Sequence, residues 1–482
     1  MKRKVERVSE IPQEEIDRQK AIMQKVFEMT QERQIQPLAY VDTYGCQQNE
    51  ADSEKLRGML VEMGYGITGD EFAADIAILN TCAVRENAEN RVLGNVGALI
   101  HAKKAKPSQT IVFCGCLAAV PETVEKIRES YKHVKLVFPP NMIWKFPEML
   151  NKALTEKKRV FEEESEAGMI AEGLPGHRDG TTKAWLPIMY GCDNYCSYCI
   201  VPYVRGRERS RDTESILEEA RTLVADGYKD ITLLGQNVNS YRAQSDSEAI
   251  SAGKGKDFPK LIRKISEIEG DFLVRFISSH PKDATVELFR AMAENEKIAR
   301  HIHLPFQAGN DRILKLMNRG YTASEYLEKL DAARELMPDI VITSDVIVGY
   351  PGETEEEFED TLKLIEKAQF EAMFTFIYSK RPGTAAAKMP DNVTREEKQV
   401  WFERLMALQN EISERKHNEY IGKTVRVLVD GEAHGEEYPL KARTNGGRLV
   451  HLKAEPSTLG SFVNAKITNS NNWSLFGVES GA

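Results

Sequence analysis

The stretch 191–211, GCDNYCSYCIVPYVRGRERSR, places Cys192, Cys196 and Cys199 within eight residues. The spacing Cys-x3-Cys-x2-Cys offers three thiolates, whereas a closed structural zinc site has four ligands. Closely spaced cysteines are also the usual ligands of iron–sulfur clusters. If three thiolates hold a four-iron cluster, one iron stays open to bind a small molecule and pass it an electron. The spacing therefore predicts a catalytic centre rather than a structural one.

Two other interpretations of this stretch involve a metal without catalysis. One is a three-cysteine zinc site that a distant histidine completes, and the other is an electron-transfer ferredoxin. A bacterial ferredoxin run reads Cys-x2-Cys-x2-Cys-x3-Cys, and this chain does not contain one. Tyr195 and Tyr198 interleave with the cysteines, and no further Cys or His follows soon after. These features favour the catalytic cluster.

Strands alternate with helices in the region around this loop. We predict strands at 184–190, 231–235, 273–278, 301–306, 340–349 and 373–378, and helices at 212–226, 284–295, 322–336 and 354–368. Six strand–helix units predict a partial parallel barrel, in which active-site residues lie in the loops that follow strands. The cysteine loop directly follows the first of these strands. The polar insert 242–256 is expected to be a mobile surface loop.

Upstream, the region 38–153 also alternates, which predicts a parallel α/β sheet. The predicted strands are 38–43, 74–80, 110–115 and 134–138, and the predicted helices lie near 50–63, 85–104, 121–130 and 143–154. A highly charged segment before them reads as one amphipathic helix. Downstream, a long helix at about 395–420 leads into a β-rich tail with the hairpin signal TNGG, which predicts a small antiparallel barrel.

Three more cysteines follow the first three strands of the upstream sheet. Cys46, Cys82 and Cys116 are 36 and 34 residues apart, close to one strand–helix–strand unit each. Parallel strands end at the same edge of a sheet, where α/β folds bind ligands, so we expect a second three-thiolate site there. The alternative is a set of scattered buried cysteines. Cys114 should share one direction with Cys116 in the pleat, and we interpret Cys114 as a buried thiol and Cys116 as the ligand.

The longer motifs resemble the radical S-adenosylmethionine (radical SAM) methylthiotransferase family, from residue 38 to nearly the end of the chain. TYGCQQN (43–49) is similar to the family's TYGCQMN, with Gln48 replacing Met. LNTCAVRENAENR (79–91) is typical of the tRNA-modifying MiaB branch. FCGCLAAV (113–120) matches at Gly115, Cys116 and Ala118, although Ala119 stands where an acidic or amide residue is usual.

This resemblance implies two 4Fe-4S clusters and S-adenosylmethionine as cofactors. Cys192, Cys196 and Cys199 would hold the radical SAM cluster, and Cys46, Cys82 and Cys116 an auxiliary cluster that supplies sulfur. One S-adenosylmethionine would donate a methyl group and another would be cleaved to a radical that takes hydrogen from a C–H bond. The protein's part is to hold these groups in line with the substrate carbon.

The expected reaction is the addition of a methylthio group to C2 of N6-isopentenyl (dimethylallyl) adenosine at position 37 of tRNA. Other members act on a threonylcarbamoyl adenosine in tRNA or on an aspartate of a ribosomal protein, and both remain alternatives. Two alternative functions do not involve this reaction: a metal-stabilised RNA-binding module and a plain electron carrier. The tail barrel and the polar loops argue against a carrier.

Polar residues follow the predicted barrel strands where the cofactor should bind. The candidate cofactor-binding residues are Gln236, Asn237, Ser279, His280, Gln307 and Asp345. For His280 and His303, a role as a buried residue bonded to backbone is an equal alternative. No G-x-G-x-x-G or P-loop pattern is present, so dinucleotide or nucleoside triphosphate binding is not indicated.

RNA contacts are expected at local basic patches, because the net charge is −9 (65 minus 74). Candidates are the arginines that follow the cluster loop and two residues of the tail barrel, which resembles a TRAM domain: Arg205, Arg207, Arg209, Arg211, Lys441 and Arg443. A solvated basic face is the alternative for the arginine run. An anticodon loop offers poorly paired bases that suit extrusion into a pocket.

Composition bounds the remaining expectations. The chain has 482 residues, 41% hydrophobic and 29% charged, which is ordinary for a globular protein. The start of the chain does not read as a secretory signal, and seven cysteines without one indicate a reducing compartment. We expect a cytoplasmic monomer without a membrane span, reduced by a donor such as flavodoxin or ferredoxin. The expected domains are a helical extension, a methylthiotransferase N-terminal domain, a linker, the radical SAM core and a TRAM-like domain, at 1–37, 38–155, 156–182, 183–415 and 416–482. A strand-bearing strap is the alternative for the linker.

Overall fold

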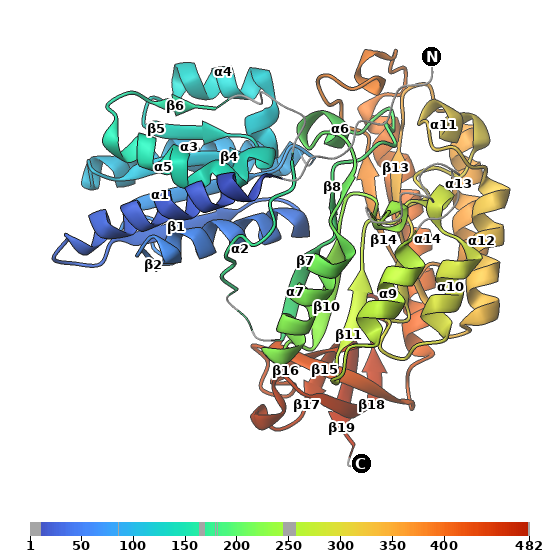
Figure 1. Cartoon of the computed structure of the whole chain (residues 1–482). Coiled ribbons are helices and arrows are strands. Elements are labelled where there is room, and N and C mark those ends of the chain that lie inside the picture. The colour runs from blue at the N-terminus through green and yellow to red at the C-terminus, as the bar shows by residue number, and fades with distance from the viewer. Residues whose placement is uncertain are drawn as a thin grey trace. The chain divides into compact units, whose positions relative to one another are not determined.

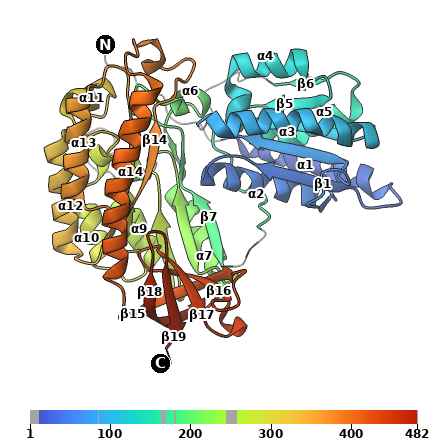
Figure 2. The same ribbon diagram turned by 180° about the vertical axis from the view of Figure 1, so that it is seen from behind.

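The computed structural model describes residues 11–84, 86–162, 169–178, 180, 182–243 and 257–480. The chain forms two compact units (Figures 1 and 2). The first unit contains Met1–Asp179, Tyr190–Asp193 and Cys199–Arg209, and the second contains Gly180–Met189, Asn194–Tyr198 and Ser210–Ala482. The division runs through the loop that carries Cys192, Cys196 and Cys199, because two of its segments pack with the first unit.

The first unit is a parallel sheet with the strand order β2-β1-β3-β4-β5-β6. Its strands are β1 Leu38–Thr43, β2 Gly66–Ile67, β3 Ile76–Thr81, β4 Thr110–Gly115, β5 Val134–Phe138 and β6 Val160–Phe161. Its helices are α1 Gln13–Gln31, α2 Gln47–Glu62, α3 Glu86–Ala105, α4 Pro121–Ser130, α5 Phe146–Thr155 and α6 Val201–Val204. The 3-10 helices η1 Cys116–Ala119 and η2 Pro140–Lys145 follow β4 and β5.

Alternating strand residues fill two cores, one on each face of this sheet. Val41, Ile78 and Val112 pack with α1, α2 and α5 on one face. Leu79 and Phe113 pack with α3, α4 and α6 on the other. The sheet is buried on both faces, as expected of parallel strands, and the long strands lie where the sequence predicted them. The short edge strand β2 was not predicted, and β6 lies within 156–182, where the sequence indicated a linker or a strand-bearing strap.

The second unit begins with a partial barrel of six parallel strands in two sheets, ordered β11-β10-β7 and β12-β13-β14. These strands are β7 Lys183–Pro187, β10 Asp230–Leu234, β11 Leu273–Phe276, β12 His301–His303, β13 Val341–Val348 and β14 Ala372–Ile377. The helices around them are α7 Thr213–Ala225, α9 Phe258–Ser266, α10 Val286–Ala293, α11 Asp311–Leu316, α12 Ala323–Leu336, α13 Glu355–Ala368 and α14 Arg395–Asn418. The short strands β8 Met189–Tyr190 and β9 Arg209–Ser210 flank the cysteine loop. The predicted partial barrel is confirmed.

Local sequence signals explain where several of these helices begin. Thr322, Thr354 and Thr394 each cap a helix, and a glutamate three residues later bonds back to the cap, which completes a capping box at α12, α13 and α14. Each of these helices thus satisfies backbone N–H groups that would otherwise lack partners.

The tail is a closed five-stranded barrel of β15 Thr424–Glu432, β16 Leu440–Thr444, β17 Leu449–Lys453, β18 Phe462–Ser470 and β19 Leu475–Glu479. The sequence predicted antiparallel pairing throughout, but β17 and β19 pair in parallel. The turn between β16 and β17 fixes this small barrel to the strands of the partial barrel. Arg275 of β11 donates to the carbonyls of Thr444 and Asn445, at 3.0 and 2.6 Å. Gly446 packs so closely on Val341 that a Cβ there would lie 3.2 Å from the valine Cβ.

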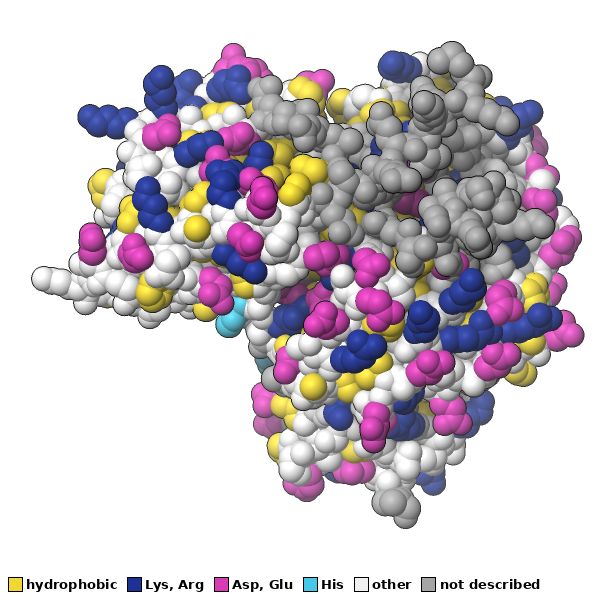
Figure 3. Space-filling model, viewed as in Figure 1, with side chains coloured by type: hydrophobic (Ala, Val, Ile, Leu, Met, Phe, Trp, Pro, Cys, Tyr) yellow, Lys and Arg dark blue, Asp and Glu magenta, His cyan; other side chains and the backbone are white. Residues whose placement is uncertain are grey.

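On the face shown in Figure 3, Lys and Arg side chains are interspersed with Asp and Glu over the small barrel and neighbouring helices. None of the helices in the described part of the chain has the length and apolar character needed to span a membrane. The predicted amphipathic helix is confirmed as α1, while 1–10 and 244–256, most of the predicted mobile insert, lie outside the described residues.

Candidate functional site

The first cysteine trio lies at the carboxyl edge of the parallel sheet, as predicted. Cys46 caps α2 directly after β1, Cys82 follows β3, and Cys116 begins η1 after β4. Gly45 precedes Cys46 with a φ of 125°, and Gly115 precedes Cys116 with a φ of 87°. Both values lie in the region that glycine adopts without steric cost. The two glycines therefore let the chain turn sharply into each cysteine position.

Contacts within the first unit bring the three cysteines of this trio together. A Cβ on Gly45 would lie 2.9 Å from Cys82 Sγ, so the backbone next to Cys46 touches Cys82. Electrostatic interactions with both Cys46 and Cys82 act on the Cys116 thiol. We call Cys46, Cys82 and Cys116 the first trio below.

A buried polar network supports the first trio from α2. Asn49 donates to the Thr81 carbonyl at 2.7 Å, and its side-chain oxygen lies 3.5 Å from Cys46 Sγ. Asn80 donates to the Asn49 carbonyl at 2.9 Å and to Ser53 Oγ at 3.0 Å. These bonds join the turns that carry Cys46 and Cys82, so α2 and β3 are held in a fixed relation.

A buried arginine completes this network. Arg205 is 6% exposed, and its Nε lies 3.2 Å from Cys116 Sγ. Its Nη2 donates to Asn49 Oδ1 at 3.0 Å and to Asp52 Oδ2 at 2.8 Å. Burial raises the pKa of the Cys116 thiol to about 12, and the Arg205 guanidinium opposes this increase. A cation on the sulfur favours the thiolate, which is the form that binds metal.

Cys114 does not share the direction of Cys116, contrary to the prediction. Cys114 is fully buried in the core that β4 forms with α1, α2 and α5, whereas Cys116 packs in the core on the opposite face. The positive φ of Gly115 ends the pleat between them, so the alternation of the strand does not continue to Cys116. Burial raises the pKa of the Cys114 thiol well above its usual value. This placement fits the interpretation of Cys114 as a buried thiol.

We call Cys192, Cys196 and Cys199 the second trio. Of these, Cys192 and Cys199 belong to the first unit. The Cys192 backbone N–H donates to the Gly206 carbonyl at 3.2 Å. Gly191 has a φ of 73°, and the Arg207 carbonyl lies where its Cβ would be. These contacts bind the start of the cysteine loop to the segment that carries Arg205.

The third cysteine, Cys196, belongs to the second unit and also lies against a buried arginine. Arg319 is 4% exposed, and its Nη1 lies 3.3 Å from Cys196 Sγ and 3.3 Å from Tyr198 Oη. The groups that act electrostatically on this guanidinium are Tyr198, Tyr321 and Cys196. Tyrosine and cysteine side chains are weak acids, so they balance the charge of a buried guanidinium less well than a carboxylate does. An anion bound beside Arg319, such as a thiolate-ligated cluster, fits this arrangement.

The neighbouring residue anchors the loop to the partial barrel. Ser197 Oγ shares a hydrogen bond of 2.7 Å with Tyr350 Oη and donates to the Leu316 carbonyl at 2.8 Å. Asn318 donates to the carbonyls of Asn194 and Tyr195, at 3.1 and 3.0 Å. These bonds anchor residues 194–197 of the loop to the partial barrel.

Three candidate cofactor residues keep buried polar atoms without a partner. Among the described residues, Gln236 Oε1, Asn237 Oδ1 and Ser279 Oγ have no hydrogen-bond acceptor or donor. Gln236 and Asn237 follow β10, Ser279 follows β11, and the Val238 N–H donates to the Ser278 carbonyl at 3.1 Å. Buried polar atoms in native proteins normally have partners. These loops therefore fit a polar ligand such as the methionine or ribose part of S-adenosylmethionine.

His280 is more firmly bonded within the protein than these residues. Its Nδ1 accepts from the Lys282 N–H at 3.2 Å, and its ring packs edge-on against Tyr321 at 5.8 Å. This contact at Nδ1 supports the interpretation of His280 as a buried residue that is bonded to the backbone.

Gln307 lies in the loop after β12, and Asp345 lies within the neighbouring strand β13. The Gln307 N–H donates to the Asp345 carbonyl at 2.9 Å, and Gln307 has a left-handed φ of 70°. Asp345 lies within β13 rather than in the loop after it, and its Oδ1 is 3.3 Å from His303 Nε2. His303 Nδ1 also contacts Thr343 Oγ1 at 2.9 Å. A left-handed, non-glycine residue at such a position is typical of a functional site.

The arginine run after the cysteine loop does not form one exposed basic face, which was the alternative to RNA contacts. Arg205, Arg209 and Arg211 are buried, whereas the Arg207 side chain is 57% exposed. Arg211 pairs with Glu219 at 2.8 Å and donates to the Pro187 carbonyl. Arg205 and Arg211 pair with carboxylates, and Arg209 donates to the Arg205 carbonyl at 3.2 Å, so the three buried arginines have structural partners within the protein. Of this run, Arg207 alone presents most of its side chain to solvent.

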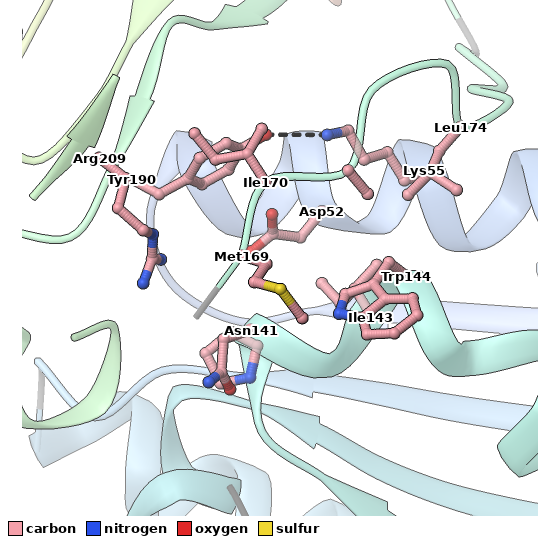
Figure 4. Close-up of a pocket in the computed structure, with 12 residues that line it drawn as sticks. Asp52, Lys55, Asn141, Ile143, Trp144, Met169, Ile170, Leu174, Tyr190 and Arg209 are labelled. Carbon is pink, nitrogen blue, oxygen red and sulfur yellow. Dashed lines mark hydrogen bonds between the residues drawn. The ribbon is translucent and has the colours of Figure 1, made fainter. Parts of the chain in front are cut away.

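A pocket of the first unit lies beside Asp52 (Figure 4). Its polar wall consists of Asp52, Lys55, Tyr190 and Arg209, and Lys55 Nζ donates to Tyr190 Oη at 2.8 Å. The apolar wall comes from η2 and the expected linker: Ile143, Trp144, Met169, Ile170 and Leu174. Residues 169–174 of the expected linker therefore pack on the first unit, as a strap would.

Sequence reasoning missed the groups that support the cysteines. Asn49 and Asp52 stand one and two helical turns into α2, and nothing in their spacing signals a role. Arg319 lies in a different part of the chain from Cys196, so only the fold brings them together. Among the described residues, no group of three His, Cys, Asp or Glu is placed to hold a single metal ion. The thiolates of a cluster bind different iron atoms, so they do not need to meet at one point.

Family models match three parts of the chain. Residues 186–365 match the Radical SAM superfamily, 38–139 match the uncharacterized protein family UPF0004, and 418–478 match the TRAM domain. The Radical SAM match implies a 4Fe-4S cluster and S-adenosylmethionine. In fold, the chain resembles a radical S-adenosylmethionine methyltransferase from Kitasatospora setae with a TM-score of 0.54 and 15% identity, over 73% of this chain and 75% of the other.

Curated relatives are similar over nearly the whole chain. A tRNA-2-methylthio-N(6)-dimethylallyladenosine synthase from Acetivibrio thermocellus is 46% identical over 96% of each chain. The protein of the same name from Thermoanaerobacter sp. (strain X514) is 45% identical over 97% of each. This chain therefore belongs to the tRNA-2-methylthio-N(6)-dimethylallyladenosine synthase family of radical SAM enzymes.

Proposed function

We propose that the protein is a tRNA methylthiotransferase that adds a methylthio group to C2 of N6-isopentenyl adenosine at position 37. The observation that carries this proposal is the first trio, gathered at the carboxyl edge of the sheet with a buried arginine on one sulfur. A radical SAM enzyme that only cleaves its cofactor needs one cluster. A second set of three cysteines provides the place for the sulfur that is transferred.

The two trios have separate roles in this proposal. Cys192, Cys196 and Cys199 hold the radical SAM cluster, and Cys46, Cys82 and Cys116 hold an auxiliary 4Fe-4S cluster. When bound, these groups supply a substrate radical and a methylated sulfur. The protein contributes rigid ligand loops, fixed by Ser197 and Asn318 at one site and by Asn49 at the other.

S-adenosylmethionine binds at the loops after β10, β11 and β12. Gln236, Asn237 and Ser279 offer the buried polar atoms that have no protein partner among the described residues. Asn237 is held in place because its Nδ2 donates to Asp283 Oδ2 at 2.7 Å. His280 follows β11, Gln307 follows β12 and Asp345 lies within β13, and these three complete the proposed set.

The tRNA contacts that we propose are Arg207, Lys441 and Arg443. Lys441 stands opposite His451 of β17, which in turn pairs with Phe476 of β19, so the three lie in one row across the barrel. The His451 and Phe476 rings stack at 5.1 Å. Aromatic rings beside cations suit RNA bases and phosphates. Arg443 also bonds Asp430 at 3.0 Å, which lowers its availability.

Salt dependence of tRNA binding tests these contacts. Lys441→Gln should weaken binding and reduce the slope of log K against log salt by about 0.7 for each phosphate of the single-stranded loop that the protein no longer neutralises. Phe476→Ala should weaken binding with the slope unchanged, because stacking releases no counterions. Identical tRNA affinities for both variants and the unchanged protein would exclude this face as the binding surface.

The remaining partners follow from the reaction. A low-potential donor such as flavodoxin or ferredoxin supplies electrons, and the protein works as a monomer in the cytoplasm. Purification under anaerobic conditions, followed by mass determination in solution, tests the monomer directly.

The substrate is tested by nucleoside mass spectrometry. Anaerobic protein is incubated with tRNA, S-adenosylmethionine and a reductant, with tRNA that carries either isopentenyl adenosine or threonylcarbamoyl adenosine. The proposal predicts a methylthio mass gain on isopentenyl adenosine only. A gain on the other nucleoside, or on a ribosomal protein instead, would overturn the substrate assignment, and zinc in place of iron would favour an RNA-binding module.

A further inference from the structure

Arg205 occupies an unusual position in the chain. It follows Cys199 of the second trio by six residues, yet its side chain contacts Cys116 of the first trio. The segment between them is part of the first unit, and Ile200 and Val204 pack in the same core as Cys116. The segment that follows Cys199 of the second trio therefore also packs beside Cys116 of the first trio.

The guanidinium is fixed by three partners that approach from different directions. Nε faces Cys116 Sγ, while Nη2 bonds both Asn49 and Asp52. Asp52 is itself buried, with its side chain 5% exposed. A planar fork held by a carboxylate cannot rotate away from the sulfur without breaking the ion pair.

We propose that Arg205 is a positioning residue of the auxiliary site: it holds Cys116 in place and raises the reduction potential of the cluster bound there. Hydrogen bonds and positive charge at a ligand sulfur stabilise the more negative, reduced cluster, so they raise the potential. Asp52 sets the direction of the guanidinium and offsets part of its charge. This inference rests on the proposed auxiliary cluster.

The ion pair is tested first in the apoprotein, which needs no cluster. Asp52→Asn leaves a buried guanidinium without its counterion and should lower the urea midpoint. The double variant Asp52→Asn with Arg205→Gln should lose less than the sum of the two single changes, because the pair is removed together. Additive losses would overturn the buried pair, whatever the cluster content proves to be.

The potential is measured in a background that lacks the second trio, with Cys192, Cys196 and Cys199 replaced by alanine. Electron paramagnetic resonance then follows one cluster during a redox titration. Arg205→Gln should reduce the ratio of reduced to oxidised cluster at least tenfold at a fixed potential, which is about 59 mV for one electron. Arg205→Lys should restore part of this loss. Arg207→Gln, two residues away and exposed, is the matched control and should leave the potential unchanged.

The outcomes separate this inference from the proposed function. An unchanged potential in a fully loaded Arg205→Gln variant would overturn the role of Arg205. If that variant binds no iron, Arg205→Lys decides: a potential equal to that of the control overturns the proposal, and a lower one supports it. A background protein that binds no iron with Arg205 intact would overturn the auxiliary cluster itself.

Discussion

Gly45→Ala should destroy the first trio while the second remains intact. Gly45 has a φ of 125°, and a Cβ on it would lie 2.5 Å from Cys82 Cβ and 2.9 Å from Cys82 Sγ. Ordinary contact between carbon atoms is about 3.5–4.0 Å, so Cys82 or the Gly45 turn must move by roughly 1 Å. Metal–ligand distances tolerate only about 0.2 Å. The left-handed backbone adds a cost of about 1–2 kcal/mol in an L-residue.

The assay compares Gly45→Ala with Gly94→Ala. Gly94 lies in α3, where a Cβ meets nothing within 4 Å, so alanine there should stabilise the protein by about 0.5–1 kcal/mol. We expect Gly45→Ala to lose about half of the iron and to cleave S-adenosylmethionine without transferring sulfur. Iron content and methylthio transfer equal to those of Gly94→Ala would refute the reasoning that the Gly45 turn places the ligands.

Three more predictions, which use four substitutions, test other parts of the account. Cys196→Ala should abolish cleavage of S-adenosylmethionine, whereas Cys82→Ala should spare some cleavage and stop sulfur insertion; equal loss of cleavage in both would show that the roles are not divided. Cys114→Ser should leave the iron content unchanged, and a drop in iron would make Cys114 a ligand. Burial raises the pKa of Glu353 to about 7 from a usual 4.5, so the folded state holds a proton that the unfolded state has lost. The free energy of unfolding should therefore fall by about 3 kcal/mol as pH rises from 4.5 through 7, and a Glu353→Gln apoprotein with the same pH dependence in urea titrations would contradict this.

The sequence predicted the strands well because their signals are local. Short apolar runs such as LAYVDT and TIVFCG are bounded by turn residues, and each became the strand that was predicted. The position of Cys46, Cys82 and Cys116 after successive parallel strands then followed from topology. The edge strands β2 and β6 have two residues each, and such short pairings carry no periodic signal.

The supporting groups of the site could not be predicted in the same way. In the sequence, Arg205 is one of several arginines in a basic run. Sequence spacing does not show that Asp52 and Cys116 contact its side chain in the folded chain. Cys114 and Cys116 were expected on one side because the pleat was assumed to continue through Gly115. The positive φ of Gly115 ends the alternation of the strand before Cys116. Long-range contacts and single backbone reversals are therefore where sequence reasoning about this site failed.

The most direct measurement is the iron and acid-labile sulfide content of anaerobically prepared protein, beside a variant with Cys46, Cys82 and Cys116 all replaced by alanine. Two cubane clusters predict about eight iron atoms per chain, falling to about four in the variant. About four iron atoms in both proteins would contradict the account, because the first trio would then hold no cluster.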